Sequence, residues 1–154
     1  MSDNDLKLGD LVHMVGVELR IAQILADQAF SDIQHPKIAS GHYTVLSLVN
    51  LNPGINQSAL ARCLYLDRSS MVPILDQLEN KGWIERRKQV TDRRSHALHL
   101  TRKGRTVLKQ LDQPVRNLEA QITKQMGKKN RDQLLALIQQ FQSVLLTLQN
   151  SEQV

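Results

Sequence analysis

The 154-residue sequence lacks several features that mark common protein classes. Cys63 is its only cysteine, so no intramolecular disulfide can form, and such cysteine usage is typical of a reducing compartment. We expect Cys63 to be a small core residue. Aromatic residues make up only 3% of the chain, and no apolar run is long enough to cross a membrane. The N-terminal stretch is polar and acidic, without the apolar segment of a signal peptide. We therefore expect a soluble, cytoplasmic protein that does not interact with membranes.

Signatures of catalysis and of metal binding are also missing from the sequence. No Ser/His/Asp or Cys/His arrangement stands in a recognisable local motif, and no glycine-rich phosphate-binding loop is present. The five histidines are dispersed, and none follows His99. The sequence therefore predicts neither an enzyme nor a protein with a metal or cofactor.

The residues that are present favour packed helices and an anionic partner. Hydrophobic residues make up 41% of the chain, with leucine dominant, which suits helices better than a sheet sandwich. Lysine and arginine number 20 against 15 for aspartate and glutamate. This basic excess makes a nucleic acid plausible as a partner without identifying it.

The spacing of apolar residues predicts a helical chain with one small β-hairpin. Asn56 and Asp67 are suitable N-caps for two short consecutive helices, and Gly82 fits the left-handed position just after the second. Two short helices joined by a tight turn and followed by a hairpin form a winged helix-turn-helix. The fold class is thus mainly α with a small β-hairpin wing. The expected helices cover residues 10–30, 42–51, 57–64, 68–81, 102–126 and 130–148, and the expected strands cover 83–89 and 96–101.

The second helix of the helix-turn-helix carries the first group of candidate DNA-binding residues. Its first turn offers Arg68, Ser69 and Ser70, and Val72 and Pro73 follow one turn later. In this motif the N-terminal turn enters the major groove, where hydroxyl groups contact base edges or phosphates and apolar groups pack on thymine methyls. The alternative is that the two serines only help to cap a surface helix.

Basic residues on the hairpin form the second group of candidate DNA-binding residues. They are Arg86, Lys88, Arg93 and Arg94, with Asp92 beside the last two. A carboxylate can hold a guanidinium group through a bidentate pair, and an arginine oriented in this way can enter a narrow minor groove. The alternative is a solvated, charged edge that prevents unwanted strand pairing.

Three motifs follow one another in this region: the helix-turn-helix, an "LExxGxxxR" exit into the wing, and a "DxR" wing tip with an "LT…G" return. Together they resemble the MarR family of transcriptional regulators. Pro73 departs from the family pattern, because relatives often have a polar or basic residue there, so base preference does not carry over at that position. The matching positions are Leu78, Glu79, Gly82, Arg86, Asp92, Arg94, Leu100, Thr101 and Gly104.

The resemblance implies a homodimer. It places a dimerisation region in residues 10–35 and 105–150 and a winged helix-turn-helix in residues 40–104 of a single domain that spans residues 1–154. The leucine-rich first and last helices support this, since they have more apolar surface than a small winged helix needs to cover. A monomer whose helices fold back on the winged helix is the alternative.

The resemblance also implies a small-molecule effector that binds between the dimerisation helices and the winged helix, and Arg20, His42 and Tyr43 are the candidate residues for it. The alternative is that His42 and Tyr43 only pack against the core. The function expected is that of a transcriptional regulator, a repressor that an organic acid or thioester releases from a pseudo-palindromic operator in double-stranded DNA. A winged-helix module that binds protein or RNA without a specific operator is the second hypothesis.

Overall fold

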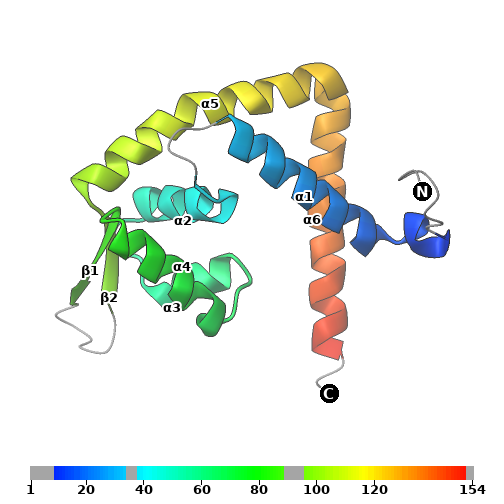
Figure 1. Cartoon of the computed structure of the whole chain (residues 1–154). Coiled ribbons are helices and arrows are strands. Elements are labelled where there is room, and N and C mark those ends of the chain that lie inside the picture. Colours follow the sequence, from blue (N-terminus) through cyan, green and yellow to red (C-terminus); the bar gives the residue numbers. More distant parts are fainter. Residues whose placement is uncertain (1–8, 34–37, 89–95, 152–154) are drawn as a thin grey trace, which may run out of the picture. The chain divides into compact units, whose positions relative to one another are not determined.

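The computed structural model describes residues 9–33, 38–88 and 96–151 (Figure 1). The described part of the chain is mainly helical, with one two-stranded antiparallel sheet. A short 3-10 helix, Gly9–His13, precedes the first α-helix. The α-helices are α1 (Val15–Asp32), α2 (Ser40–Leu51), α3 (Gln57–Cys63), α4 (Arg68–Asn80), α5 (Arg102–Met126) and α6 (Lys128–Ser151), and the strands are β1 (Ile84–Lys88) and β2 (His96–Leu100).

The chain divides into two compact units, Met1–Pro114 and Val115–Val154, whose boundary falls inside α5. The first unit contains the helix-turn-helix and the hairpin predicted from the sequence, which confirms the mainly α fold class with its β-hairpin wing. The second contains the C-terminal part of α5 and the whole of α6. Among the described residues, no helix combines the length and the apolar character needed to cross a membrane.

Local capping explains where the helices of the helix-turn-helix begin and end. The Asn56 side chain accepts a hydrogen bond from the Ala59 amide at 2.8 Å, and the Asp67 carboxylate accepts one from the Ser70 amide at 2.7 Å. Each bond satisfies an amide at a helix N-terminus that has no partner within the helix. Gly82 follows α4 with a φ of +68°, a conformation that favours glycine. These three predictions are confirmed.

The wing is anchored by a third extended segment that the sequence did not reveal. Strands β1 and β2 pair antiparallel, with Ile84 opposite Leu100. On the other side of β2, the Gly54 amide donates to the Leu98 carbonyl at 2.9 Å, and the Leu98 amide donates to the Ile55 carbonyl at 2.9 Å. The start of α3 is therefore tied directly to the wing.

A single apolar core fills the first unit. Helices α2, α3 and α4 gather beside the hairpin (Figure 1), and their apolar faces meet those of β2 and the N-terminal half of α5. Burial of these side chains is the main contribution that holds α4 and the wing together. The fully buried side chains from these elements include Leu46, Leu60, Met71, Leu75, Leu78, Leu98 and Leu111.

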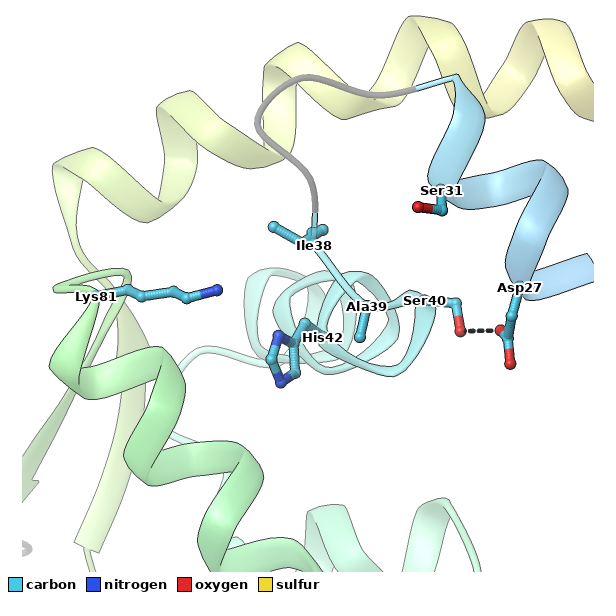
Figure 2. Close-up of a pocket in the computed structure, with 7 residues that line it drawn as sticks. All are labelled: Asp27, Ser31, Ile38, Ala39, Ser40, His42 and Lys81. Atoms are coloured by element: carbon cyan, nitrogen blue, oxygen red, sulfur yellow. Dashed lines mark hydrogen bonds between the residues drawn. The ribbon is translucent and has the colours of Figure 1, made fainter. Parts of the chain in front are cut away.

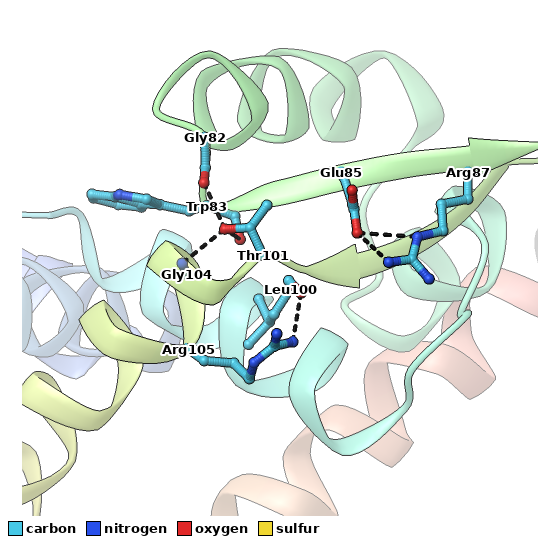
Figure 3. A network of polar contacts seen from close by, with 8 residues as sticks. All are labelled: Gly82, Trp83, Glu85, Arg87, Leu100, Thr101, Gly104 and Arg105. Carbon is cyan, nitrogen blue, oxygen red and sulfur yellow. Dashed lines mark hydrogen bonds and ion pairs between the residues drawn. The ribbon is translucent and has the colours of Figure 1, made fainter.

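The junction between β2 and α5 explains the "LT…G" pattern (Figure 3). The Thr101 hydroxyl donates to the Gly82 carbonyl at 2.6 Å and accepts a bond from the Gly104 amide at 3.0 Å, so it caps α5 and ties it to the end of α4. At Gly104 the helix approaches the backbone of Trp83 so closely that an added Cβ would lie 1.9 Å from the Trp83 carbonyl oxygen. Only glycine fits this crossing.

The structure corrects three details of the sequence prediction. The first α-helix begins at Val15 rather than at Asp10, because Met14 is extended and separates it from the 3-10 turn. The last helix begins at Lys128, before Asn130. Cys63 was expected to be a small core residue but is exposed, since Leu60 and Ala61 supply the buried face of α3.

Candidate nucleic-acid interface and ligand pocket

The first two turns of α4 present all the candidate DNA-binding residues of that helix to solvent. Arg68, Ser69, Ser70, Val72 and Pro73 are exposed, whereas the opposite face of the helix carries the buried core residues. Pro73 lies inside α4 and has no amide hydrogen to donate to the preceding turn. All five predicted residues of α4 are therefore accessible to a partner.

Asp67 organises the two serines at the N-terminus of α4. The Ser69 hydroxyl donates to its carboxylate at 2.6 Å and the Ser70 hydroxyl donates at 3.0 Å. These bonds, first that of the Ser69 hydroxyl and then those of the Ser70 amide and hydroxyl, hold the pKa of Asp67 below its usual value. Both serines thus take part in capping, as the alternative interpretation had it. Both serines are exposed, and a hydroxyl group that donates one hydrogen bond can still accept others, for example from base amino groups.

Arg86 occupies a different place from the one that the sequence suggested. Its guanidinium group donates to Asp76 at 2.7 Å and to Glu79 at 2.5 Å, and only 22% of its side chain is exposed. Both carboxylates belong to α4, the second helix of the helix-turn-helix, which is called the recognition helix in this motif. Arg86 therefore joins the wing to the recognition helix. This arrangement favours a positioning role over a direct contact with phosphate.

We expect Arg86→Met to loosen the wing. The change keeps the apolar stem of the side chain but leaves Asp76 and Glu79 without their cation. Because these ion pairs are partly buried, the free energy of unfolding should fall by about 1–2 kcal/mol, between the values for exposed and for buried pairs. Arg87→Met is the matched control, because Arg87 is 61% exposed and its ion pair among the described residues is with Glu85 of the same strand (Figure 3). Chemical denaturation should show a loss of stability for Arg86→Met and a change below about 0.5 kcal/mol for Arg87→Met. Equal effects would contradict the assigned role of Arg86.

Of the remaining candidates, Lys88 alone lies within the described residues. Lys88 ends β1, opposite His96, and is exposed. Asp92, Arg93 and Arg94 lie outside the described residues, so their role stays a prediction.

A cavity of about 420 Å³ lies beside the N-terminus of α2 (Figure 2). It opens between α1, the segment that leads into α2, and the end of α4. Apolar and polar groups share its wall, as is usual in sites for small organic ligands. The lining residues are Asp27, Ser31, Ile38, Ala39, Ser40, His42 and Lys81.

Only one of the three predicted effector residues lines this cavity. His42 does, whereas Tyr43 packs its ring against that of Phe30 with 5.6 Å between centroids, and Arg20 is exposed on α1. Asp27 and Lys81 also line the cavity but were not among the residues predicted from the sequence. Lys81 follows α4 directly, and only the folded chain brings it beside α2.

Hydrogen bonds keep a negative charge at one end of the cavity. The Asp27 carboxylate accepts a bond from the Ser40 hydroxyl (Figure 2) and one from the Gln23 amide group at 3.0 Å. The Ser40 bond, then the Gln23 bond and the charge of Arg20, hold the pKa of Asp27 below its usual value, although partial burial opposes them. Asp27 is therefore ionised at neutral pH.

The environment of His42 keeps its imidazole ring neutral. Burial and then the positive charge of Lys81 lower the pKa of His42 below its usual value, while a hydrogen bond to the Gln77 side chain opposes them. His42 is only 9% exposed, and its Nδ1 atom has no hydrogen-bond partner among the described residues. Within that part of the chain, no group of three or more His, Cys, Asp or Glu side chains is placed to hold a metal ion.

A helix-turn-helix with an exposed recognition helix, mounted beside a basic hairpin, defines a winged helix-turn-helix DNA-binding protein. Residues 38–96 match the model of the MarR family. A protein of Thauera aromatica to which transcriptional regulation of the hcr operon is assigned is 33% identical over 139 residues, covering 89% of this chain and 84% of its own.

Two solved structures extend this similarity over nearly the whole chain. The transcriptional repressor CouR bound to a 23-mer DNA duplex is 35% identical, with a TM-score of 0.81, covering 89% of this chain and 98% of its own. CouR bound to p-coumaroyl-CoA is 32% identical, with a TM-score of 0.81, covering 89% of this chain and 97% of its own. This chain belongs to the MarR family of transcriptional regulators.

Proposed function

We propose that this protein is a dimeric repressor that binds a pseudo-palindromic operator and is released by an aromatic acyl thioester. The exposed N-terminal turn of α4, held against the wing by Arg86, is the observation on which the DNA-binding part rests. The similarity to a repressor in complex with a DNA duplex supports it. In this proposal Arg68, Ser69 and Ser70 contact the major groove, and the wing contacts the backbone or the minor groove.

The proposed dimer interface is formed by apolar side chains that are exposed in a single chain. MarR-family regulators are dimers, and a single chain here exposes leucines and valines that a soluble protein normally covers. We assign dimerisation to residues 10–35 and 105–150 and DNA binding to residues 40–104, within one domain. The exposed apolar residues include Leu11, Val12, Val15, Ile21, Ile24 and Leu25 on the N-terminal side, and Leu134, Leu137, Val144, Leu145 and Leu148 on α6.

The proposed effector site is the cavity beside α2. The similarity to CouR in complex with p-coumaroyl-CoA favours an aromatic acyl thioester as the ligand class. The cavity volume of about 420 Å³ suits an aromatic ring, with the rest of a thioester extending outward. His42 stays in this site together with Lys81. Arg20 is not part of the cavity wall, and its positive charge helps to lower the pKa of Asp27.

Release from DNA follows from the geometry of a dimer. The two recognition helices must lie about one DNA turn apart, roughly 34–36 Å, to read both half-sites. A ligand weakens DNA binding only if it binds better to a dimer with another separation. A tenfold loss of DNA affinity needs about 1.4 kcal/mol of such preference, and DNA must then weaken ligand binding by the same factor. A regulator of this kind acts on the chromosome, which agrees with the cytoplasmic location expected from the sequence.

Selection of bound sequences from a random pool of DNA duplexes tests the DNA-binding part. We expect an enriched pseudo-palindrome whose half-site centres are about one helical turn apart. A pool that yields no consensus would contradict the proposal and favour the second hypothesis, a module that binds protein or RNA.

Lys88→Gln should weaken binding to all duplexes alike. An exposed lysine on the wing contacts phosphate rather than bases, so its loss should reduce the slope of log K against log salt by about 1 per chain. Arg94→Ala should instead weaken binding to the selected operator by about 1–3 kcal/mol more than to unrelated DNA. Titrations at several salt concentrations measure both effects. A Lys88→Gln variant with an unchanged slope would contradict the phosphate contact.

A further inference from the structure

The His42 ring offers a buried acceptor to the cavity. Its Nδ1 atom is buried and has no hydrogen-bond partner among the described residues. In a neutral imidazole one nitrogen carries the proton and the other accepts, so Nδ1 is an acceptor when the proton is on Nε2. A buried polar atom without a partner is costly, and a ligand that satisfies it gains affinity.

Lys81 places a donor beside this acceptor. Its ammonium group extends toward Ile38 and His42 in Figure 2 and lies 4.6 Å from the centre of the Trp83 ring. The cation–π contact holds the side chain in place and leaves ammonium hydrogens free to bind a ligand. The cavity thus offers one acceptor and one donor in the same place.

The hydrogen-bonding groups at this point suit a neutral hydroxyl group of the ligand better than an ionised carboxylate. The titratable groups in its wall are His42, Lys81 and Asp27 among the described residues, and the neutral His42 leaves one positive and one negative charge. A carboxylate would add a second negative charge and could not donate a hydrogen bond to Nδ1. A hydroxyl group can donate to Nδ1 and accept from the ammonium group of Lys81 at once.

We propose that His42 and Lys81 bind a hydroxyl group on the aromatic ring of the effector, so that the protein selects hydroxylated aromatic thioesters over those without the hydroxyl. This rests on the proposed function, because it concerns the same cavity. The two residues that bind the hydroxyl are also linked to α4, since Lys81 directly follows its last residue and Gln77 on α4 influences the pKa of His42.

The proposed contact has a pH dependence of defined sign. The hydroxyl needs a neutral His42, and protonation of the ring removes the acceptor. Since burial and Lys81 place the pKa of His42 below its usual value of about 6.5, affinity should be constant above that pH and fall as the pH drops through the lowered pKa. An anionic ligand group at the same place would give the opposite sign, because it would be held more tightly by the protonated ring.

The experiment compares p-coumaroyl-CoA with cinnamoyl-CoA, which lacks only the ring hydroxyl, by calorimetry from about pH 5 to about pH 8. We expect wild type to prefer p-coumaroyl-CoA by tenfold or more at neutral pH, because cinnamoyl-CoA leaves Nδ1 unpaired. Trp83 is the only tryptophan, and its contact with Lys81 makes its fluorescence a second readout. Coenzyme A and p-coumarate alone show which half of the thioester supplies the affinity.

Two variants separate the hydroxyl contact from general packing. His42→Leu removes the acceptor and should reduce the preference for p-coumaroyl-CoA to about twofold or less. His42→Asn keeps an acceptor near the position of Nδ1 but does not titrate, so it should keep much of the preference and lose the pH dependence. Circular dichroism establishes that both variants are folded.

The outcomes distinguish the proposed hydroxyl contact from the proposed effector function. Equal affinity of wild type for the two thioesters, or affinity that rises as the pH falls, would overturn the hydroxyl contact. If neither thioester binds, or if binding leaves DNA affinity unchanged, the proposed effector function itself fails.

Discussion

Gly104→Ala is expected to destabilise the protein by about 3 kcal/mol or more, one of the largest effects of a single methyl group in this chain. The added Cβ would lie 1.9 Å from the Trp83 carbonyl oxygen. The backbone of α5 fixes the position of the Cβ and the oxygen belongs to the backbone of Trp83, so no rotation of a side chain relieves the collision. The N-terminus of α5 must then move away from the wing. At about 2–4 °C per kcal/mol for a chain of this size, the melting temperature should fall by roughly 6–12 °C.

Gly41→Ala is the matched control for this change. Gly41 is also helical, but an added Cβ there has no atom within 4 Å. Since alanine loses less entropy than glycine on entering a helix, Gly41→Ala should be neutral or stabilise by up to about 1 kcal/mol. Thermal unfolding measured for both variants decides the matter. A Gly104→Ala protein as stable as wild type would show that α5 does not cross Trp83 as closely as the structure has it.

Leu137→Asp is expected to weaken dimerisation at least a hundredfold, which corresponds to about 2.7 kcal/mol. Leu137 is 53% exposed on α6 in a single chain, on the stripe that also carries Leu134 and Leu145. A symmetric dimer contains each residue twice, so two unpaired carboxylates would have to be buried, each at a cost of several kcal/mol. Sedimentation should show monomers at concentrations at which wild type is dimeric, and operator binding should fall with it.

Gln139→Asp introduces the same charge on the opposite side of α6, where the side chain is exposed. It should leave the dimer intact. If Leu137→Asp remains as dimeric as Gln139→Asp, the apolar stripe of α6 is not the interface. A wild-type protein that is monomeric at micromolar concentration would contradict the dimer as a whole.

The features that the sequence predicted correctly are those with a local cause. Asn56 and Asp67 stand immediately before the helices that they cap, and their bonds reach only three residues along the chain. Gly82 comes just after Lys81, the C-cap of α4, and takes the left-handed conformation. Such signals need no knowledge of the rest of the fold.

The features that the sequence did not reveal depend on tertiary contacts. In the sequence, Arg86 is indistinguishable from the other basic residues of the predicted wing. Only the packing of β1 against α4 in the folded chain brings it to Asp76 and Glu79. A pair of carboxylates three residues apart on a helix was the available signal, but many exposed helices carry such a pair. Lys81 also depends on tertiary structure, because it lines the same cavity as His42 only when the end of α4 lies beside α2.

The effector residues illustrate the difference most clearly. Arg20 and Tyr43 were chosen with His42 because they are polar residues on a helix pair that the family resemblance marked. In the structure Tyr43 faces Phe30 and Arg20 is exposed, while Asp27 of the same first helix lines the cavity. The neighbouring elements decide which side of a helix faces a cavity. The spacing of apolar residues shows which side is buried, but it does not show which of the adjacent sides lines the cavity.

Titration of the selected operator duplex with this protein, in the presence and absence of p-coumaroyl-CoA, tests the central claim most directly. Fluorescence anisotropy of a labelled duplex gives the affinity and the number of chains bound. We expect two chains per duplex and an affinity that falls tenfold or more at saturating p-coumaroyl-CoA, which corresponds to about 1.4 kcal/mol of coupling. One chain per duplex, or an affinity that p-coumaroyl-CoA leaves unchanged although it binds to the protein, would contradict a dimeric repressor controlled through the cavity beside α2.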